Sequence, residues 1–278
     1  MKKLISLAVT GAVAGLVLAG VSGMARAAEE QKVAKNISFS FEGPFGTFDR
    51  QQLQRGYKVY NKVCSNCHSM NLVSFRNLAE AGIFNEAEVK ALAASFEGKY
   101  KADPDDTGEV KDRNGLPSDH FPAPFANEQA ARASNGGAYP PDLSLLARAR
   151  PGWTGIINQL FWGSGGPQYI YSVLTGYNET PEEGVTCGEG KAFNPYFAGG
   201  PCIGMPANGT LSDGGLEFDD GAPNKIEDQA KDVAAFLAWA SEPHMEARKS
   251  MGFTVMIYLA VLSVLLYLVK KRIWADAH

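Results

Sequence analysis

Five consecutive residues, Cys64-Ser65-Asn66-Cys67-His68, restrict what this chain can fold around. Two cysteines separated by two residues and followed at once by histidine are typical of a c-type heme attachment site. Two thiols about one helical turn apart can each add to a vinyl group of one porphyrin. The adjoining histidine can then offer an imidazole nitrogen to the iron. The motif predicts one covalently attached heme c, bound by Cys64 and Cys67, with His68 as an iron ligand.

Cysteines at this spacing have two other common roles. A redox-active pair does not require the histidine, and a zinc site requires a second cluster of ligands. The two remaining cysteines, Cys187 and Cys202, are not in this spacing. The sequence therefore favours heme over both alternatives.

The N-terminus has the organisation of a secretory signal peptide. Lys2-Lys3 is basic, Leu4 to Val21 is almost wholly apolar, and Ala25-Arg26-Ala27 has the form of a cleavage site. We expect residues 1–27 to be removed, so that the mature chain begins at about Ala28. The alternative is an uncleaved N-terminal anchor, against which the small residues and the cleavage site argue.

The other end of the chain predicts a transmembrane helix. Met251 to Val269 contains 19 residues without a charge, and a helix of this length spans about 28 Å, close to the hydrocarbon thickness of a bilayer. Basic residues flank it on both sides, and Tyr267 and Trp274 lie near its C-terminal end. A buried core helix would normally carry a polar stripe, whereas this stretch has only Thr254 and Ser263.

The two end segments together predict the organisation of the chain. Export of everything after the signal peptide gives a periplasmic heme-binding domain at 28–248, a single span at 251–269 in the bacterial inner membrane and a cytoplasmic tail at 270–278. Residues 28–248 contain 19 Lys plus Arg and 29 Asp plus Glu, a net charge of −10. A field of that sign disfavours nucleic acid and favours basic partners.

The exported part reads as mainly α-helical with long irregular loops. Apolar residues at three- and four-residue steps predict a helix from Thr47 or Asp49 to about the heme motif, with Gly56 on its apolar face for close helix crossing. An Asn85/Glu88 capping box predicts a helix that ends near Phe96. Polar or Gly- and Pro-rich sequence predicts loops at 99–127 and 177–220. Further helices are expected at 128–133, about 168–175 and 226–240.

A heme iron bound by His68 can be open on its other face or closed by a second ligand. Met205 lies in Gly204-Met205-Pro206, where a Gly-containing backbone can approach the porphyrin. A lone methionine is more often a core filler, but Met205 is the strongest candidate. The other histidines and methionines of the expected mature chain are disfavoured by position: His120, His244, His278, Met70, Met245, Met251 and Met256.

Three further features have both a functional and an ordinary interpretation. Cys187 and Cys202 are expected to form a disulfide in an oxidising compartment, with free thiols as the alternative. Arg148 and Arg150 can bind heme propionates or lie on the surface. Eight acidic residues and one lysine between Glu179 and Asp220 can form a docking ring for a basic electron carrier or a solvated face.

Several motifs in combination make the chain similar to the cytochrome c1 family, the heme-bearing subunits of bacterial cytochrome bc1 complexes. The resemblance covers nearly the whole length. It is carried by Arg55-Gly56-Tyr57 before the heme motif, Tyr139-Pro140-Pro141-Asp142-Leu143-Ser144, Ala147-Arg148-Ala149-Arg150, Gly166-Pro167-Gln168-Tyr169, Leu174-Thr175-Gly176-Tyr177, and Ala238-Trp239-Ala240-Ser241-Glu242-Pro243 before the apolar segment.

The resemblance implies a class I c-type cytochrome core in which the Gly56 helix crosses the helix ending near Trp239. It implies His68 and Met205 as the iron ligands. It also implies heme contacts from Pro141, Arg150 and Tyr169, and a bacterial-type Cys187–Cys202 disulfide.

The implied function is electron transfer from the Rieske iron–sulfur subunit to a soluble or tethered basic c-type cytochrome, beside cytochrome b and without a catalytic acid or base in this chain. The alternatives are a free-standing membrane-anchored electron carrier and a heme enzyme or sensor with an open iron site.

Overall fold

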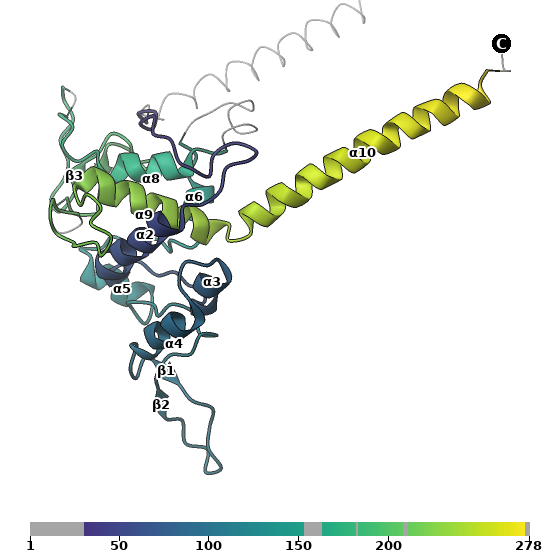
Figure 1. Cartoon of the computed structure of the whole chain (residues 1–278). Coiled ribbons are helices and arrows are strands. Elements are labelled where there is room, and N and C mark those ends of the chain that lie inside the picture. Colours follow the sequence, from purple (N-terminus) through teal and green to yellow (C-terminus); the bar gives the residue numbers. More distant parts are fainter. Residues whose placement is uncertain (1–30, 153–162, 182, 208–210, 276–278) are drawn as a thin grey trace, which may run out of the picture.

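The computed structural model describes residues 31–152, 163–181, 183–207 and 211–275 (Figure 1). The expected signal peptide lies outside these residues. The described part is mainly helical and has only two short pairs of strands. Its elements are α2 (Arg50–Lys62), the 3-10 helix η1 (Cys64–Asn66), α3 (Phe75–Glu80), α4 (Glu86–Ala94), β1 (Tyr100–Lys101), β2 (Asp112–Arg113), α5 (Glu128–Ser134), α6 (Leu146–Ala149), α8 (Gly166–Leu174), β3 (Ala192–Phe193), β4 (Cys202–Ile203), α9 (Ile226–Ser241) and α10 (Met245–Ile273).

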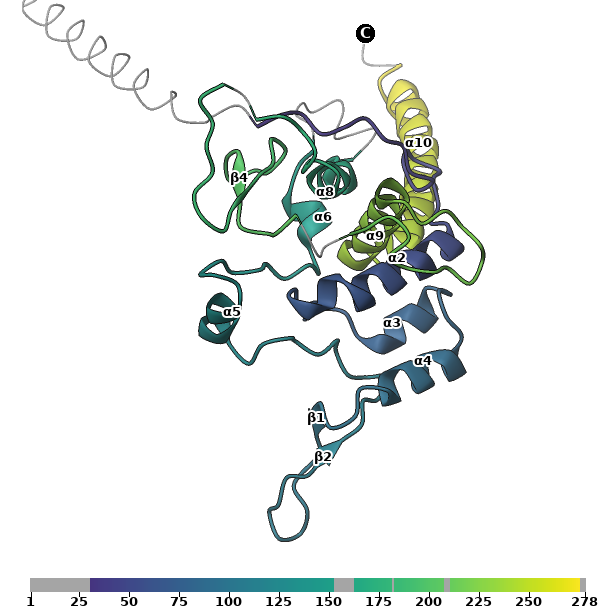
Figure 2. The ribbon, with the colours of Figure 1, turned by 90° about the vertical axis from the view of Figure 1, so that its left-hand side faces the viewer.

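The crossing of α2 and α9 is the centre of the fold (Figure 2). A Cβ atom at Gly56 would lie 2.1 Å from the carbonyl oxygen of Asp232 and 2.7 Å from the Cβ of Phe236. Any side chain at this position would force the helices apart, which confirms the close crossing expected at Gly56. Buried aromatic and aliphatic side chains fill the space around the crossing, among them Leu53, Tyr60 and Trp239.

A polar contact fixes the same crossing. Arg55 donates from Nε to Asp232 Oδ2 at 2.7 Å, and the Gln52 amide donates to Asp232 Oδ1 at 3.0 Å. Burial raises the pKa of Asp232, and the hydrogen bonds from Arg55 and Gln52 oppose this shift. The carboxylate is thus paired from α2, as a buried charge requires.

On the other side of α9, the short helices α6 and α8 pack against it and against each other (Figure 2). Helices α3 and α4 pack together on the far side of α2. The β1–β2 hairpin projects from this end of the molecule, away from α10 (Figure 1). The heme motif follows directly after α2, so the helix crossing sets its position in the fold.

Local capping signals located two helices correctly. Asp49 accepts hydrogen bonds from the amides of Gln51 and Gln52 at the start of α2. The reciprocal Asn85/Glu88 capping box begins α4, which ends at Ala94 rather than near Phe96. The sequence interpretation missed α3 and both strand pairs, which are two to six residues long and depend on contacts with other segments.

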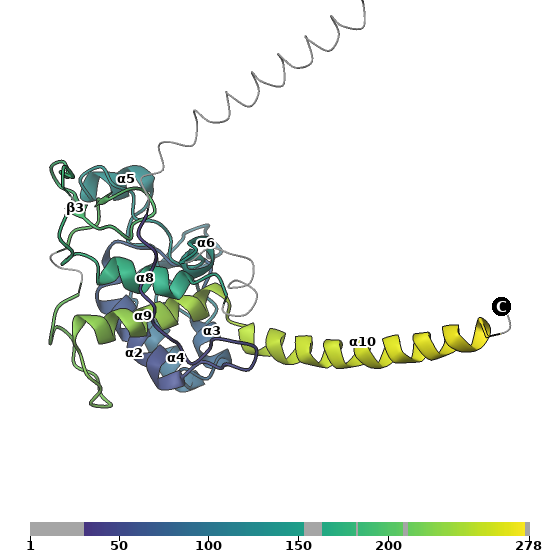
Figure 3. The same cartoon turned by 90° about the horizontal axis from the view of Figure 1, so that it is seen from above.

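Helix α10 leaves the head as a long rod (Figure 3). Its apolar part is exposed along its length, and it is the one helix of the described residues long and apolar enough to cross a membrane. It extends beyond the expected span at both ends and includes the flanking basic residues. Only three residues, 242–244, lie between the end of α9 and the start of α10.

Candidate heme site

A cavity of about 320 Å³ lies beside the heme motif. Hydrophobic side chains form most of its wall, including Leu143, Ile170, Val233 and Leu237. All seven residues expected to contact heme also line it: Cys64, Cys67, His68, Pro141, Arg150, Tyr169 and Met205. The structure therefore brings two thiols, an imidazole and a thioether from distant segments to one largely apolar cavity, a donor set that fits a heme.

The two cysteines are positioned by the end of α2. The helix stops at Lys62, and the chain continues into the single turn η1. The amides of Cys67 and His68 both donate to the carbonyl oxygen of Cys64, at 3.1 and 2.8 Å. Burial raises the pKa of the Cys64 thiol to about 12. This shift is opposite in direction to the lowered pKa that activates the thiol of a redox pair.

The imidazole of His68 has a defined hydrogen-bond partner. Its Nδ1 lies 2.8 Å from the carbonyl oxygen of Pro141. A carbonyl oxygen can only accept, so Nδ1 carries the proton and Nε2 keeps a free lone pair. Burial lowers the pKa of His68, which favours this neutral form. A neutral imidazole with its second nitrogen fixed by a carbonyl is the form suited to ligating a metal.

The Pro141 carbonyl is held by a network of hydrogen bonds around Asp142. The Asp142 carboxylate accepts from the Ser69 hydroxyl, the Asn71 amide and the Ser144 amide, each at 2.8 Å. Burial alone would raise the pKa of Asp142, but these donors bring it below its usual value. We call the two joined segments, residues 64–72 and 139–144, the His68 wall.

Met205 is delivered by a different kind of segment, residues 177–207, which we call the Met205 loop. Just before it turns to the cavity, the loop forms the two-residue strand pair β3–β4 and the Cys187–Cys202 disulfide. The Tyr177 hydroxyl donates to the carbonyl oxygen of Met205 at 3.2 Å. A Cβ on Gly204 would lie 3.0 Å from the Cβ of Ala138, so the missing side chain allows close approach there.

Tyr177 was not among the expected site residues. The only signal in the sequence was its place at the end of Leu174-Thr175-Gly176-Tyr177, which gave no indication of its partner. The Asp142 network was missed for the same reason. Both join segments that lie far apart in the sequence.

The two arginines of the 147–150 motif have different surroundings. Arg150 is exposed to solvent and lines the rim of the cavity, whereas Arg148 lies 3.9 Å from Glu242 and is not part of the cavity wall. Tyr169 is buried, and its hydroxyl accepts from the Ala198 amide at 3.2 Å. Of the two arginines, only Arg150 lines the cavity.

The acidic segment between Glu179 and Asp220 is partly neutralised within the chain. Glu179 pairs with Lys32 at 2.6 Å, Asp219 with Lys58 at 3.1 Å, and Asp220 with Arg55 at 2.6 Å. A docking ring built from this segment would have fewer free charges than its composition suggests.

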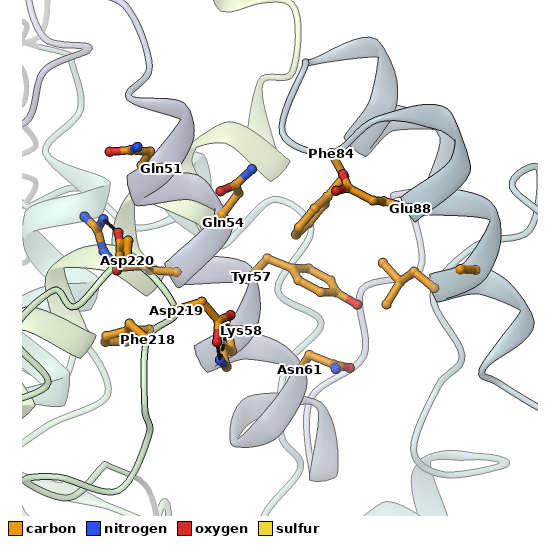
Figure 4. A pocket seen from close by; sticks show the side chains of 13 residues that line it. Gln51, Gln54, Tyr57, Lys58, Asn61, Phe84, Glu88, Phe218, Asp219 and Asp220 are labelled. Carbon is orange, nitrogen blue, oxygen red and sulfur yellow. Dashed lines mark hydrogen bonds and ion pairs between the residues drawn. The ribbon is translucent and has the colours of Figure 1, made fainter.

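A larger and more open groove, of about 670 Å³, lies elsewhere on the molecule (Figure 4). It runs between α2, α4 and the loop at 218–220, and its walls combine amide side chains with Tyr57 and Phe84. No cysteine, histidine or methionine lines it. Its wall therefore offers no thiol, imidazole or thioether to a heme. Within the residues that the structure describes, no group of three or more His, Cys, Asp and Glu converges either, so the zinc alternative lacks its ligands.

A helical head with a Cys-X-X-Cys-His cavity, followed by one apolar helix, defines a membrane-anchored c-type cytochrome. The profile described as the Cytochrome C1 family matches residues 39–277. The chain belongs to the cytochrome c1 family and is a heme c-bearing, membrane-anchored electron-transport subunit of the cytochrome bc1 type.

Curated relatives agree with this placement. The chain is 44% identical over 278 residues to "Cytochrome c1" of Rhodospirillum rubrum, with 95% of each chain covered. It is 43% identical over 290 residues to "Cytochrome c1" of Cereibacter sphaeroides, covering 95% of this chain and 94% of the relative. It is also 46% identical over 284 residues to "Cytochrome b/c1" of Bradyrhizobium diazoefficiens, covering all of this chain but only 41% of that relative.

Proposed function

We propose that this chain carries one heme c on Cys64 and Cys67, with His68 and Met205 as the two axial ligands. The observation that carries this proposal is the position of the His68 imidazole, whose Nδ1 faces the Pro141 carbonyl while its ring lines the same cavity as Met205. A heme with two protein ligands cycles between two oxidation states by one electron without binding a substrate at the iron.

The residues around the cavity have separate tasks in this function. Pro141 fixes the tautomer of His68, and Tyr177 holds the backbone of Met205. Arg150 at the rim offers a two-point donor to a propionate. Hydrophobic side chains from α8 and α9 line the cavity and would exclude water from a bound heme. An apolar surrounding would favour a raised reduction potential.

The electron route and the topology are also proposals. The chain would accept electrons singly from a Rieske iron–sulfur subunit, beside cytochrome b, and pass them to a basic soluble or tethered c-type cytochrome. Residues 28–248 would lie in the periplasm after loss of residues 1–27, with 251–269 as the span and 270–278 in the cytoplasm. The net charge of −10 of the proposed periplasmic part supports a basic acceptor.

Exchange of the methionine ligand tests the site. Met205→Leu should lower the reduction potential sharply and let carbon monoxide bind the reduced heme, because an apolar side chain of similar size leaves the iron open. The unaltered chain should bind almost none. Met70→Leu is the matched control, since Met70 is fully buried in the core and does not line the cavity. Rapid carbon monoxide binding by the unaltered chain would contradict the Met205 assignment and favour an open enzyme or sensor site.

A further inference from the structure

Residues that flank the turn at 43–47, together with Gly46 within it, are hydrogen-bonded to the beginning of α10. The Phe48 amide and the Arg50 guanidinium donate to the Glu246 carboxylate, at 2.7 Å for the closest contact of each. The Lys249 ammonium donates to the carbonyl oxygens of Phe41 and Gly46, at 2.6 and 3.0 Å. The turn and the helix therefore form one unit at the base of the head.

Glu246, Lys249 and Phe253 lie on one face of α10, because residues three, four and seven apart in a helix share a face. The turn follows this face toward the apolar span. At its tip the ring of Phe45 meets the ring of Phe253 edge-on, with centroids 5.8 Å apart. Phe253 is the third residue of the uncharged stretch that begins at Met251, so the tip of the turn lies level with the start of the membrane-spanning part.

The tip has the composition of a membrane-facing segment. Residues 43–47 carry no charge, and Phe45 is 75% exposed. The neighbouring aromatic residues Phe41 and Phe48, by contrast, are buried and in contact with each other. The turn thus sends one ring away from the core although the core accepts its neighbours.

At this end the helix has Phe253 as its aromatic residue and neither tyrosine nor tryptophan. Between Met245 and Met256 it contains no Tyr or Trp, whereas Tyr267 and Trp274 lie at its other end. Tyrosine and tryptophan are enriched at both interfaces of a spanning helix. Phe45 adds a second ring beside Phe253 at this end of the helix.

We propose that the turn at 43–47 is a second membrane contact, in which Phe45 lies in the interfacial layer of a phospholipid bilayer beside the first turns of α10. Together with the Glu246 and Lys249 contacts, this gives the head two points of attachment. The tilt of the head, and with it the height of the heme cavity above the bilayer, is then fixed. The proposal requires only that α10 spans a membrane, and it does not depend on the heme ligands.

Two glycines make the turn possible. Gly43 has a φ of +70°, which disfavours any residue with a side chain, and a Cβ on Gly46 would lie 2.1 Å from the carbonyl oxygen of Glu42. The backbone of the turn is therefore set independently of the residue at its tip. Substitution of Phe45 should leave the turn itself intact.

Collision measurements on a nitroxide label test the location of the tip. The label is attached to Phe45→Cys in the heme-loaded full chain, assembled with its complex in phosphatidylcholine liposomes. Val110→Cys, on the hairpin that projects away from α10, is the control (Figure 1). At position 45 we expect molecular oxygen to relax the label and a water-soluble nickel chelate not to relax it. At position 110 we expect the nickel chelate to relax the label more than oxygen does.

Two results would overturn the proposal. Equal nickel relaxation at both positions would place the tip in water, and a label at 45 relaxed by neither reagent would place it against a partner protein. The heme spectrum of each variant shows separately whether the site is intact.

A second variant pair tests whether the turn fixes the tilt of the head. Phe45→Asp should broaden the distribution of heme orientations in oriented membranes, and Phe45→Trp should preserve it. An unchanged distribution in Phe45→Asp would refute the two-point attachment.

Discussion

The His68 wall and the Met205 loop bring the two proposed iron ligands to one cavity, but they are stabilised by different means. In the His68 wall, one carboxylate, Asp142, accepts three hydrogen bonds and ties two distant segments together. In the Met205 loop, a disulfide and a two-residue strand pair restrain the chain, and a single tyrosine hydroxyl holds the Met205 carbonyl.

This difference follows from what each segment can use. The His68 wall extends a long helix and has hydroxyl and amide donors close to a carboxylate, so polar contacts suffice to fix it. The Met205 loop is rich in glycine and proline and has little repeating backbone hydrogen bonding, so a large conformational entropy opposes its order. A covalent link offsets part of this entropy because it restricts the unfolded chain. The Met205 side should therefore be the more easily perturbed of the two.

Removing the disulfide should have the largest effect. The double variant Cys187→Ser/Cys202→Ser should lose about 3 kcal/mol of unfolding free energy, as expected for a link that closes a loop of about 15 residues. Met205 should detach before the head unfolds. Loss of the methionine–iron absorption band during denaturation measures this detachment. Tyr177→Phe, which removes one neutral hydrogen bond, is the control and should cost about 1 kcal/mol. A band that survives until global unfolding would show that the disulfide does not support the ligand.

Disrupting the His68 wall should have a smaller effect on stability and a different spectroscopic result. Asp142→Ala leaves three donors without their acceptor, and its partial exposure lets water replace some of the bonds, so we expect a loss of about 2 kcal/mol. Asp142→Asn keeps one acceptor oxygen and should lose less. The measurement is denaturant unfolding of the heme-loaded chain, with the methionine–iron band recorded in parallel. If Asp142→Ala removed that band first, the two sides of the cavity would not be independent.

The smallest effect concerns the ion pair between Lys32 and Glu179, which joins the first described residues to the start of the Met205 loop. The Lys32 ammonium and the Tyr196 hydroxyl donate to the Glu179 carboxylate at 2.6 and 2.8 Å and lower the pKa of Glu179. The stabilisation of the folded state by these contacts is fully present above the ordinary pKa of glutamate. It is lost as the pH falls through the lowered pKa of Glu179 in the folded chain.

Glu179→Gln should therefore be slightly less stable than the unaltered chain at neutral pH, and the difference should vanish at low pH. Thermal unfolding across that pH range measures it. Glu183→Gln, at an exposed position of the same loop, provides the baseline. A difference that grew on acidification would contradict the assigned direction.

Much of the fold was predictable because its signals are local. The Asp49 and Asn85 caps bond to amides within three residues, so they begin α2 and α4 whatever surrounds them. The uncharged stretch from Met251 is apolar enough to define a spanning helix by itself. Gly56 was recognisable as a crossing point because it interrupts the apolar face of a helix.

The elements that the sequence did not predict share one physical property. Helix α3 is about one and a half turns long and relies on the Ser74 and Asn77 side chains. Its first backbone amides also donate hydrogen bonds to the carbonyl oxygens of residues 117 and 119. The β1–β2 pair joins residues that have no alternating apolar pattern. Segments as short as these cannot be stable alone, and their sequences therefore carry little signal.

By itself, the sequence determined the heme attachment motif, the spanning helix and the identity of the candidate ligands, because each rests on residue chemistry or on neighbours within a few positions. Only the tertiary structure decided that Pro141 fixes the tautomer of His68, that Tyr177 holds Met205, and that Phe45 reaches the base of α10. These contacts join backbone and side-chain atoms far apart in the chain. Their energies depend on how the α2–α9 crossing and the loops around it pack, which no local pattern records.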